Sequence, residues 1–99
     1  MHLISARNLN LAASQYPDLE ENLKIICKNI QDANWSHLVE LQQVYPTTEA
    51  VGSFTVINVK GNKYRLILSI DYERQVAYFK YFLTHAEYDK EQWKNDYYY

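Results

Sequence analysis

Three segments rich in Val, Ile, Tyr and Phe, separated by very short connections, occupy the second half of this sequence. They run over residues 54–60, 63–72 and 75–83. Residues of these types favour strands, and Gly61 can supply the positive φ of a two-residue hairpin turn. Because connections this short join only neighbouring antiparallel strands, the three segments predict an antiparallel meander.

The two connections, Gly61-Asn62 and Glu73-Arg74, set the expected register of this meander. Counting outward pairs Arg65 with Asn58 and with Phe82, and Ile67 with Val56 and with Lys80. One face then carries the polar set Asn58, Arg65, Ser69, Tyr78 and Lys80. The other face carries an apolar set: Ile57, Val59, Tyr64, Leu66, Leu68, Ile70, Ala77, Phe79, Tyr81 and Leu83. We expect the apolar face to meet helices and the polar face to stay open.

The first half of the sequence has helical patterns. A short extended segment, residues 2–4, precedes a helix over about residues 6–15, which Ser5 begins and Pro17 ends. Asp18 and Glu21 have the spacing of a capping box and are read as caps, not as a catalytic carboxylate pair. The helix that follows, to about Gln31, places apolar residues at helical spacing: Leu19, Leu23, Ile26 and Ile30.

Two further short helices are expected. One runs from Ser36 to about Gln43, before a connecting loop over residues 47–53. The other follows the last strand, where Thr84 and Glu87 have capping-box spacing, and extends toward Trp93.

The resulting order β-α-α-(α)-β-β-β-α predicts an α+β fold, with N-terminal helices packed on one face of a small antiparallel sheet and a short C-terminal helix. A chain of 99 residues is expected to form one domain, residues 1–99.

Cysteine content and hydropathy limit the expected environment. The single Cys27 cannot form an internal disulfide, and no Cys/His spacing suggests a metal site. No segment looks like a secretion signal or is long enough to cross a bilayer. A cytoplasmic protein without a membrane role is therefore expected. The terminal tyrosines, residues 97–99, are read as a poorly ordered end without a function.

Charge is unevenly distributed along the chain. The net charge of -2 argues against a protein that binds nucleic acid by bulk positive charge alone. Residues 58–80, however, contain five basic and two acidic side chains, a balance of +3, whereas residues 1–50 contain three basic and six acidic ones, a balance of -3. Cations beside aromatic rings on an open sheet face suit RNA.

Two motifs carry a resemblance to a known family. The run Asn58-Val-Lys-Gly-Asn-Lys-Tyr-Arg-Leu-Ile and the later Leu83-Thr-His-Ala-Glu-Tyr-Asp-Lys resemble the HigB family of bacterial type II toxins, which belongs to the RelE-like superfamily. The Met-His-Leu-Ile start and Tyr16-Pro17 also resemble that family. The resemblance implies a RelE-like fold and an mRNA endoribonuclease that cuts transcripts in the ribosomal A site. It also implies a HigA-type helix-turn-helix antitoxin that inhibits the toxin, and binding to operator DNA only through that antitoxin.

The resemblance also implies a mechanism without a metal ion or another cofactor. RelE-like enzymes let the 2′-OH of the substrate attack the adjacent phosphate, which leaves a 2′,3′-cyclic phosphate and a 5′-OH. Arg65 matches the arginine of Gly-Asn-x-x-Arg and would bind the scissile phosphate. His85 is expected as acid or base, with Tyr88 as its partner or as a ring that stacks on RNA. The expected RNA-binding residues are Asn58, Lys60, Asn62, Lys63, Tyr78 and Lys80. Many RelE relatives have a further arginine near the end of the last strand, where this chain has Phe82, Leu83 and Thr84.

Structural readings of the same residues remain open. His85 can be an idle exposed residue at a helix start, and Arg65 can pair with Asp71 or Glu73. His2 and His37 are read as surface residues. Two other functions are therefore considered: an inactive toxin-like scaffold that binds an antitoxin and modulates operon repression, and a general single-strand RNA binder.

Overall fold

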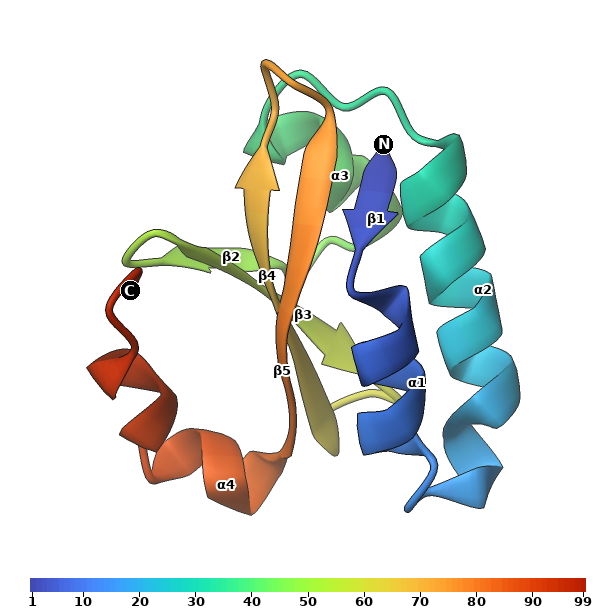
Figure 1. The fold of residues 1–99 in the computed structure, drawn as a ribbon, viewed down its shortest axis with the longest axis vertical. Helices are drawn as coiled ribbons and strands as arrows, with labels where there is room; N and C mark the ends of the chain where they lie inside the picture. Colours follow the sequence, from blue (N-terminus) through green and yellow to red (C-terminus); the bar gives the residue numbers. More distant parts are fainter.

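The computed structural model describes residues 1–99 and confirms an α+β fold (Figure 1). Its helices and strands follow in the order β1 (His2–Ile4), α1 (Ala6–Ala13), α2 (Glu20–Asp32), α3 (Leu38–Val44), β2 (Glu49–Val51), β3 (Phe54–Val59), β4 (Tyr64–Asp71), β5 (Val76–Thr84) and α4 (His85–Asp89). Single 3₁₀ turns over Pro17–Leu19 and Gln92–Asn95 precede α2 and follow α4. No helix has the length and apolar character needed to cross a membrane.

The five strands form one sheet in the order β1-β5-β4-β3-β2. The predicted meander of β3, β4 and β5 is confirmed, and its strands pair antiparallel. The sheet is mixed, however, because β1 pairs parallel to β5. The helices between β1 and the meander form a connection long enough for this parallel pairing. The expected loop over residues 47–53 is also wrong, since β2 pairs there with β3.

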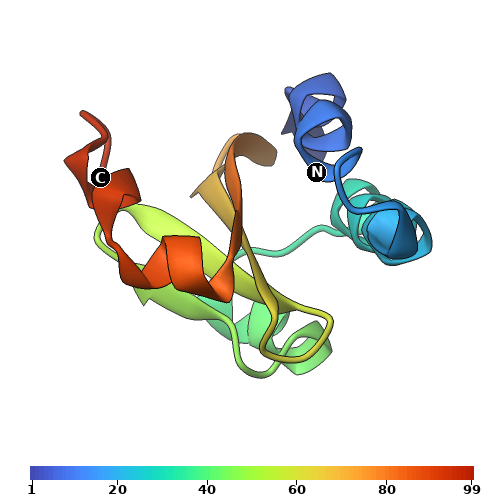
Figure 2. The ribbon, with the colours of Figure 1, turned by 90° about the horizontal axis from the view of Figure 1, so that it is seen from below.

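Helices α1 and α2 lie on the same side of the sheet, as Figure 2 shows. Their buried residues form one core with the strands: Leu9, Leu19, Leu23, Ile26 and Ile30 from the helical side, and Ile57, Val59, Leu66, Leu68 and Ala77 from the sheet. The predicted packing of the N-terminal helices on the apolar face is therefore confirmed.

The register of β5 differs from the prediction in one half of the strand. Ser69 pairs with Tyr78 as expected, but a bulge shifts the ladder between Ile67 and Leu68. Ile67 then pairs with Tyr81 instead of Lys80, and Arg65 with Leu83 instead of Phe82. Lys80 is the extra residue of the bulge, which leaves two residues of one strand opposite one of the other.

This bulge exchanges the faces of the last residues of β5. Phe82, expected on the polar face, lies in the core beneath the helices. Tyr81 and Leu83, expected in that core, lie on the opposite face with Phe54 and Ile67. A regular strand alternates its side chains, so one added residue explains why all three assignments fail together.

The face opposite the helices is only partly open. A second apolar cluster forms there from Phe54, Val56, Ile67 and Trp93. Trp93 comes from the 3₁₀ turn after α4, so the C-terminal segment covers the middle of the face expected to stay open. We call these four residues the Trp93 cluster. The cover is needed because exposed aromatic and aliphatic side chains at this position would leave a large apolar patch in water.

The chain end takes part in this cover, so the expectation of a poorly ordered end is wrong. The ring of Tyr99 packs edge-on against Phe54 and Trp93, with centroid distances of 6.2 and 5.6 Å. The hydroxyl of Ser53 donates a hydrogen bond of 3.4 Å to the carbonyl oxygen of Tyr99. These contacts fix the last residue against the turn between β2 and β3.

One predicted cap is confirmed and two are wrong. Ser5 occupies the N-cap position of α1, but its side chain makes no capping hydrogen bond. Thr84 and Glu87 form a complete capping box at the start of α4. Asp18 caps no helix, because a 3₁₀ turn over Pro17–Leu19 precedes α2 and places the residue toward the meander. There its carboxylate accepts a hydrogen bond of 2.5 Å from Lys60.

Candidate functional site

Arg65 is a buried arginine near the start of β4, with 8% of its surface exposed. Its Nη1 donates to the carbonyl oxygens of Asn62 and Tyr64 at 3.0 and 3.2 Å. Its Nη2 donates to the side-chain oxygen of Asn62 at 2.6 Å. Arg65 makes no hydrogen bond to Asp71 or Glu73, the alternative partners that the sequence left open. The β3–β4 connection therefore positions this guanidinium.

Two features of that connection explain its shape. Lys60 and Gly61 both have positive φ, at 53° and 67°, which turns the chain tightly after β3. The four residues 60–63 separate Val59 from its partner Tyr64, so the predicted register is preserved. Asn62, at the tip of the turn, is thereby directed back toward Arg65.

Tyr88 completes the other side of the arginine. The Arg65 guanidinium carbon lies 5.2 Å from the centroid of the Tyr88 ring, a distance at which a cation is attracted to the ring face. The Tyr88 ring stacks in turn on Trp93, with centroids 5.1 Å apart. Burial and the nearby charge of Glu49 raise the pKa of Tyr88, against the opposing effect of Arg65. The phenol therefore stays protonated at neutral pH.

These residues line a cavity of about 210 Å³ on the face away from the helices. Its walls are Thr47, Glu49, Val56, Asn58, Asn62, Arg65 and Tyr88. We call it the Arg65 cavity. Asn58 is held there by a hydrogen bond of 3.0 Å from its side-chain nitrogen to the Thr47 hydroxyl. The cavity combines a cation, a neutral phenol, two amides and one carboxylate.

The sequence reasoning missed Glu49, which is the only carboxylate in the Arg65 cavity. The residue lies in β2, a segment that was read as a loop. A signal for this strand exists, because Gly52-Ser53 separates Val51 from its pairing partner Phe54. Glycine followed by a small polar residue is typical of a two-residue hairpin turn.

His85 is the predicted catalytic residue that lies outside the Arg65 cavity. It opens α4. Its Nδ1 lies 2.8 Å from the Asp89 carboxylate, and 44% of the side chain is exposed. Its backbone N–H donates to the carbonyl oxygen of Lys63 at 2.9 Å, which ties α4 to the β3–β4 connection. His85 is thus one helical turn away from Tyr88 and is oriented by a carboxylate.

The predicted cations do not gather in the cavity. Lys60 pairs with Asp18, and Lys63 is exposed at the turn. Lys80 lies 3.4 Å from Asp96, and Tyr78 lines a separate cavity together with Lys80. The structure therefore brings together four predicted site residues, namely Asn58, Asn62, Arg65 and Tyr88. The others lie around them or apart: Lys60, Lys63, Tyr78, Lys80 and His85.

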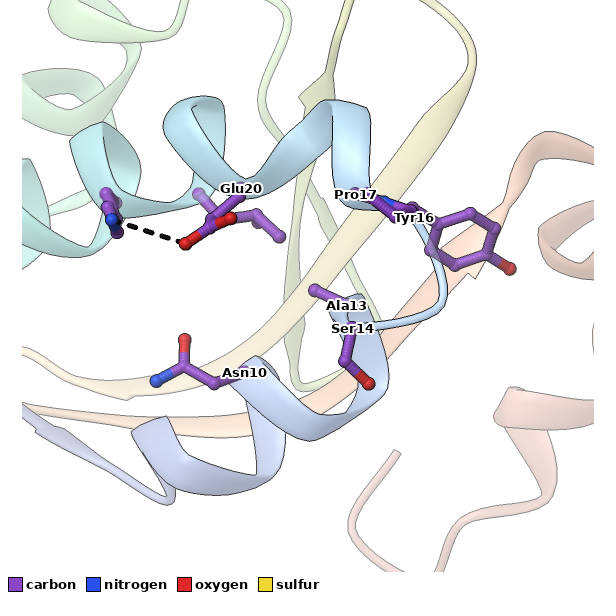
Figure 3. Close-up of a pocket in the computed structure, with 8 residues that line it drawn as sticks. Asn10, Ala13, Ser14, Tyr16, Pro17 and Glu20 are labelled. Atoms are coloured by element: carbon purple, nitrogen blue, oxygen red, sulfur yellow. Dashed lines mark ion pairs between the residues drawn. The ribbon is translucent and has the colours of Figure 1, made fainter.

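A further cavity of about 490 Å³ lies between α1 and the start of α2 (Figure 3). It is lined by Asn10, Ala13, Ser14, Tyr16, Pro17, Glu20, Leu23 and Lys24, with Lys24 and Glu20 paired at 3.3 Å. None of these residues was predicted to act on RNA. No three His, Cys, Asp or Glu side chains come together as metal ligands.

Known proteins resemble this chain over nearly its whole length. Residues 19–91 match a family described as HigB_toxin, the RelE-like toxic component of a toxin-antitoxin system. The mRNA interferase toxin HigB of Escherichia coli K12 is 30% identical over 92 residues, which cover 90% of this chain and 88% of that protein. The mRNA interferase HigB of E. coli O6:H1 is 28% identical over 93 residues, 91% of this chain and 90% of that protein.

The matched residues 19–91 contain every wall of the Arg65 cavity as well as His85. The family extends over more than half of the chain, and the relatives have nearly the same length. The resemblance that the sequence motifs indicated is therefore confirmed, and this chain belongs to the HigB family of RelE-like toxins.

Proposed function

We propose that this chain is an endoribonuclease that cuts mRNA in the Arg65 cavity. The observation that carries the proposal is a buried arginine held by Asn62 and stacked on a protonated Tyr88, beside a carboxylate. A fixed guanidinium offers planar donors to a phosphate. The names of the relatives, mRNA interferases, support the same substrate.

The proposed step is an internal transfer at phosphorus. The 2′-oxygen of the RNA attacks the adjacent phosphorus while the bond to the 5′-oxygen breaks, which leaves a 2′,3′-cyclic phosphate and a 5′-OH. Glu49 is positioned to accept the proton of the 2′-OH, and the Tyr88 phenol to donate one to the leaving oxygen. Arg65 stabilises the charge on the phosphorane. The two proton transfers of this step need no metal ion or other cofactor.

His85 has a supporting role in the proposed step. Its Nδ1 is directed at Asp89, so Nε2 is the atom free for proton exchange. From the first residue of α4 it can exchange a proton with the substrate or with Tyr88 one turn later. Lys63 and Lys60, at the β3–β4 connection, supply positive charge for the RNA backbone, and Asp18 reduces the contribution of Lys60.

The proposal also includes an antitoxin partner and the ribosome. The family description implies an antitoxin as a partner, and we propose that it is of the HigA type and carries operator binding for the complex. The +3 balance of residues 58–80 is small for a protein that must hold RNA alone. We therefore propose that the ribosomal A site presents the mRNA, which places the toxin in the cytoplasm.

One observation favours the alternative of an inactive scaffold. A guanidinium has five N–H donors, and three hydrogen bonds to the chain already occupy part of this set in Arg65. If substrate cannot reach the remaining donors, the fold would serve only to bind an antitoxin and modulate repression.

Primer extension on mRNA in a translating extract separates the two functions. The chain, freed of its antitoxin, should produce cuts whose downstream fragments have 5′-OH ends, so that they ligate only after treatment with a polynucleotide kinase. Addition of the toxin to the same mRNA without ribosomes tests ribosome dependence. A folded toxin that produces no cuts in either reaction would exclude the enzyme and leave the scaffold.

A further inference from the structure

A second cavity, of about 530 Å³, lies at the other end of the sheet face that carries Arg65. It is lined by Ser5, Ser69, Tyr78, Phe79, Lys80 and Tyr98. Ser69 follows Arg65 by four residues on β4 and points to the same face, because side chains alternate along a strand. At a strand rise of about 3.3 Å per residue, the two positions are roughly 13 Å apart. The Trp93 cluster lies between the two positions, and a few nucleotides of a single strand can pass over it to bridge this distance.

Two tyrosines make the walls of this second cavity aromatic and accessible. Tyr78, on β5, is 42% exposed, and Tyr98, near the chain end, is 66% exposed. Accessible aromatic rings can stack on unpaired bases of a single strand. Tyr98 comes from the terminal tyrosines, residues 97–99, for which the sequence indicated no function.

A network around Asp96 holds Tyr98 in place. The Asp96 carboxylate accepts a hydrogen bond of 2.8 Å from the backbone N–H of Tyr98 and one of 2.7 Å from the hydroxyl of Tyr81. Lys80 lies 3.4 Å from the same carboxylate and 5.1 Å from the centroid of the Tyr98 ring. These contacts hold the backbone of Tyr98 and place Lys80 beside its ring, which lowers the entropic cost of binding.

The charge in this region indicates which part of a nucleotide would fit. Lys80 is the only cation in the lining, and Asp96 compensates its charge. A phosphate would gain little there, since strong phosphate sites present uncompensated Arg or Lys. Two rings and the hydroxyls of Ser5 and Ser69, which both donate and accept hydrogen bonds, suit an uncharged nucleobase instead.

We infer that this cavity is a subsite for an unpaired base of the RNA whose phosphate lies in the Arg65 cavity. This inference rests on the proposed function and deepens it. The shared sheet face favours RNA over a segment of a protein partner, because one strand can occupy both cavities. Tyr78 and Tyr98 stack on the base, and Lys80 lies beside the Tyr98 ring.

Binding is tested by NMR titration of the purified toxin with a short single-stranded RNA whose riboses are 2′-O-methylated. The modification removes the attacking hydroxyl, so the RNA is not cut. We expect chemical-shift changes at the backbone amides of Ser5, Ser69, Tyr78 and Tyr98. Tyr98→Ser should weaken binding by about 5- to 150-fold, the range of alanine substitutions at base-stacking rings. Tyr98→Phe keeps the ring and should bind like the unchanged protein.

Two further variants separate stacking from a loosened chain end. Tyr78→Ser removes the ring on β5 without touching the C-terminal segment, and it should weaken binding to a similar degree. Val39→Ser is the control, because Val39 is an exposed apolar residue on α3 that does not line the cavity. Its affinity should stay unchanged. An unchanged indole signal of Trp93 in each variant shows that the segment remains packed.

The outcomes keep the subsite and the proposed function apart. Shifts at the Arg65 cavity with none at Ser69 or Tyr98 would overturn the subsite and leave the enzyme intact. Shifts at both cavities in a protein that produces no cuts would retain the subsite and overturn the enzyme. No RNA-induced shift at the subsite, with shifts there on addition of the antitoxin, would identify the cavity as a protein contact and overturn the inference.

Discussion

The Arg65 cavity and the Trp93 cluster occupy the same face of the sheet, yet one is polar and hollow and the other is apolar and filled. Alternate residues of β3 and β4 supply both, with Val56 and Ile67 under Trp93 and Asn58 and Arg65 one pair further along. The contrast teaches that the C-terminal segment does two things at once. It covers the apolar half of the face and delimits the polar half.

Tyr88 physically joins the two regions. Its ring stacks on Trp93 and lies against the Arg65 guanidinium. The indole N–H of Trp93 also donates to the carbonyl oxygen of Tyr88 at 3.0 Å. A filled, rigid cluster thus holds one wall of the cavity, as preorganised sites require.

The largest effect on stability should come from the filled region. Trp93→Ala removes the central ring of the Trp93 cluster, and truncation of a buried Trp costs about 3 to 5 kcal/mol of unfolding free energy. Tyr97→Ala, at an exposed position nearby, should change it by less than about 0.5 kcal/mol. Denaturant unfolding measures both. Equal losses in the two variants would show that Trp93 is not packed as described.

The hollow region should respond in activity as well as in stability. Asn62→Ala removes the side-chain oxygen that accepts from Arg65 Nη2, a hydrogen bond to a charged donor worth about 1.5 to 3 kcal/mol. We expect mRNA cleavage to fall about tenfold or more, and the unfolding free energy to fall by up to about 1.5 to 3 kcal/mol, because the buried Arg65 loses one acceptor. Asn22→Ala, on the exposed side of α2, is the matched control. Full cleavage by the Asn62 variant would remove this residue from the positioning of Arg65.

A pH dependence should mark the link between the chain end and the sheet. The Tyr81 hydroxyl, the backbone N–H of Tyr98 and Lys80 hold the pKa of Asp96 below its usual range. The folded protein therefore binds this proton less tightly than the unfolded chain does. Its stabilisation is present above the ordinary carboxyl pKa of about 4 and is lost as pH falls through the lowered value.

Asp96→Asn tests that sign. The variant should lose about 1 to 2 kcal/mol at neutral pH, where the charged carboxylate contributes its hydrogen bonds. As pH falls through the lowered pKa of Asp96, the two proteins should approach each other in stability, because the wild-type carboxylate becomes protonated. Unfolding curves from acid to neutral pH check this. A difference that stays constant with pH would show that the charge of Asp96 stabilises nothing.

The smallest effect is expected at Lys60. Its ammonium is engaged by Asp18 on the exposed surface, where salt screens the interaction. Lys60→Ala should reduce mRNA cleavage by less than about twofold, as expected for a charge that is already partnered and exposed. Lys63→Ala, which removes a cation without such a partner, should reduce it more. The reverse order would show that Lys60 leaves Asp18 to bind RNA.

Local patterns in the sequence were enough to predict much of this fold. The turn at Gly61, the β3–β4 register and the capping box at Thr84 are local features, and the structure confirms them. The apolar spacing of α2 likewise predicted the face that packs on the sheet. The motif around Arg65 led to the HigB family, and four of the expected site residues share one cavity.

Several of the failures depend on contacts between distant parts of the chain. Lys80 forms a bulge because Phe82 fits under the helices while Tyr81 fits beneath the C-terminal segment, and neither partner is adjacent in sequence. Glu49 enters the site through β2, a three-residue strand whose one local signal is the Gly52-Ser53 hairpin turn. The terminal tyrosines look like a free tail until the Trp93 cluster offers them a surface.

The central claim is that Arg65 acts on the phosphate while the rest of the face holds it. The most direct measurement compares the rate of mRNA cleavage, in a translating extract, by Arg65→Ala and by Arg74→Ala. Arg74 is an exposed arginine in the β4–β5 turn. Loss of one charge-stabilising donor costs about 100- to 1000-fold in rate, so the account predicts this loss for Arg65→Ala and full activity for Arg74→Ala. Undiminished cleavage by a folded Arg65→Ala protein would contradict it.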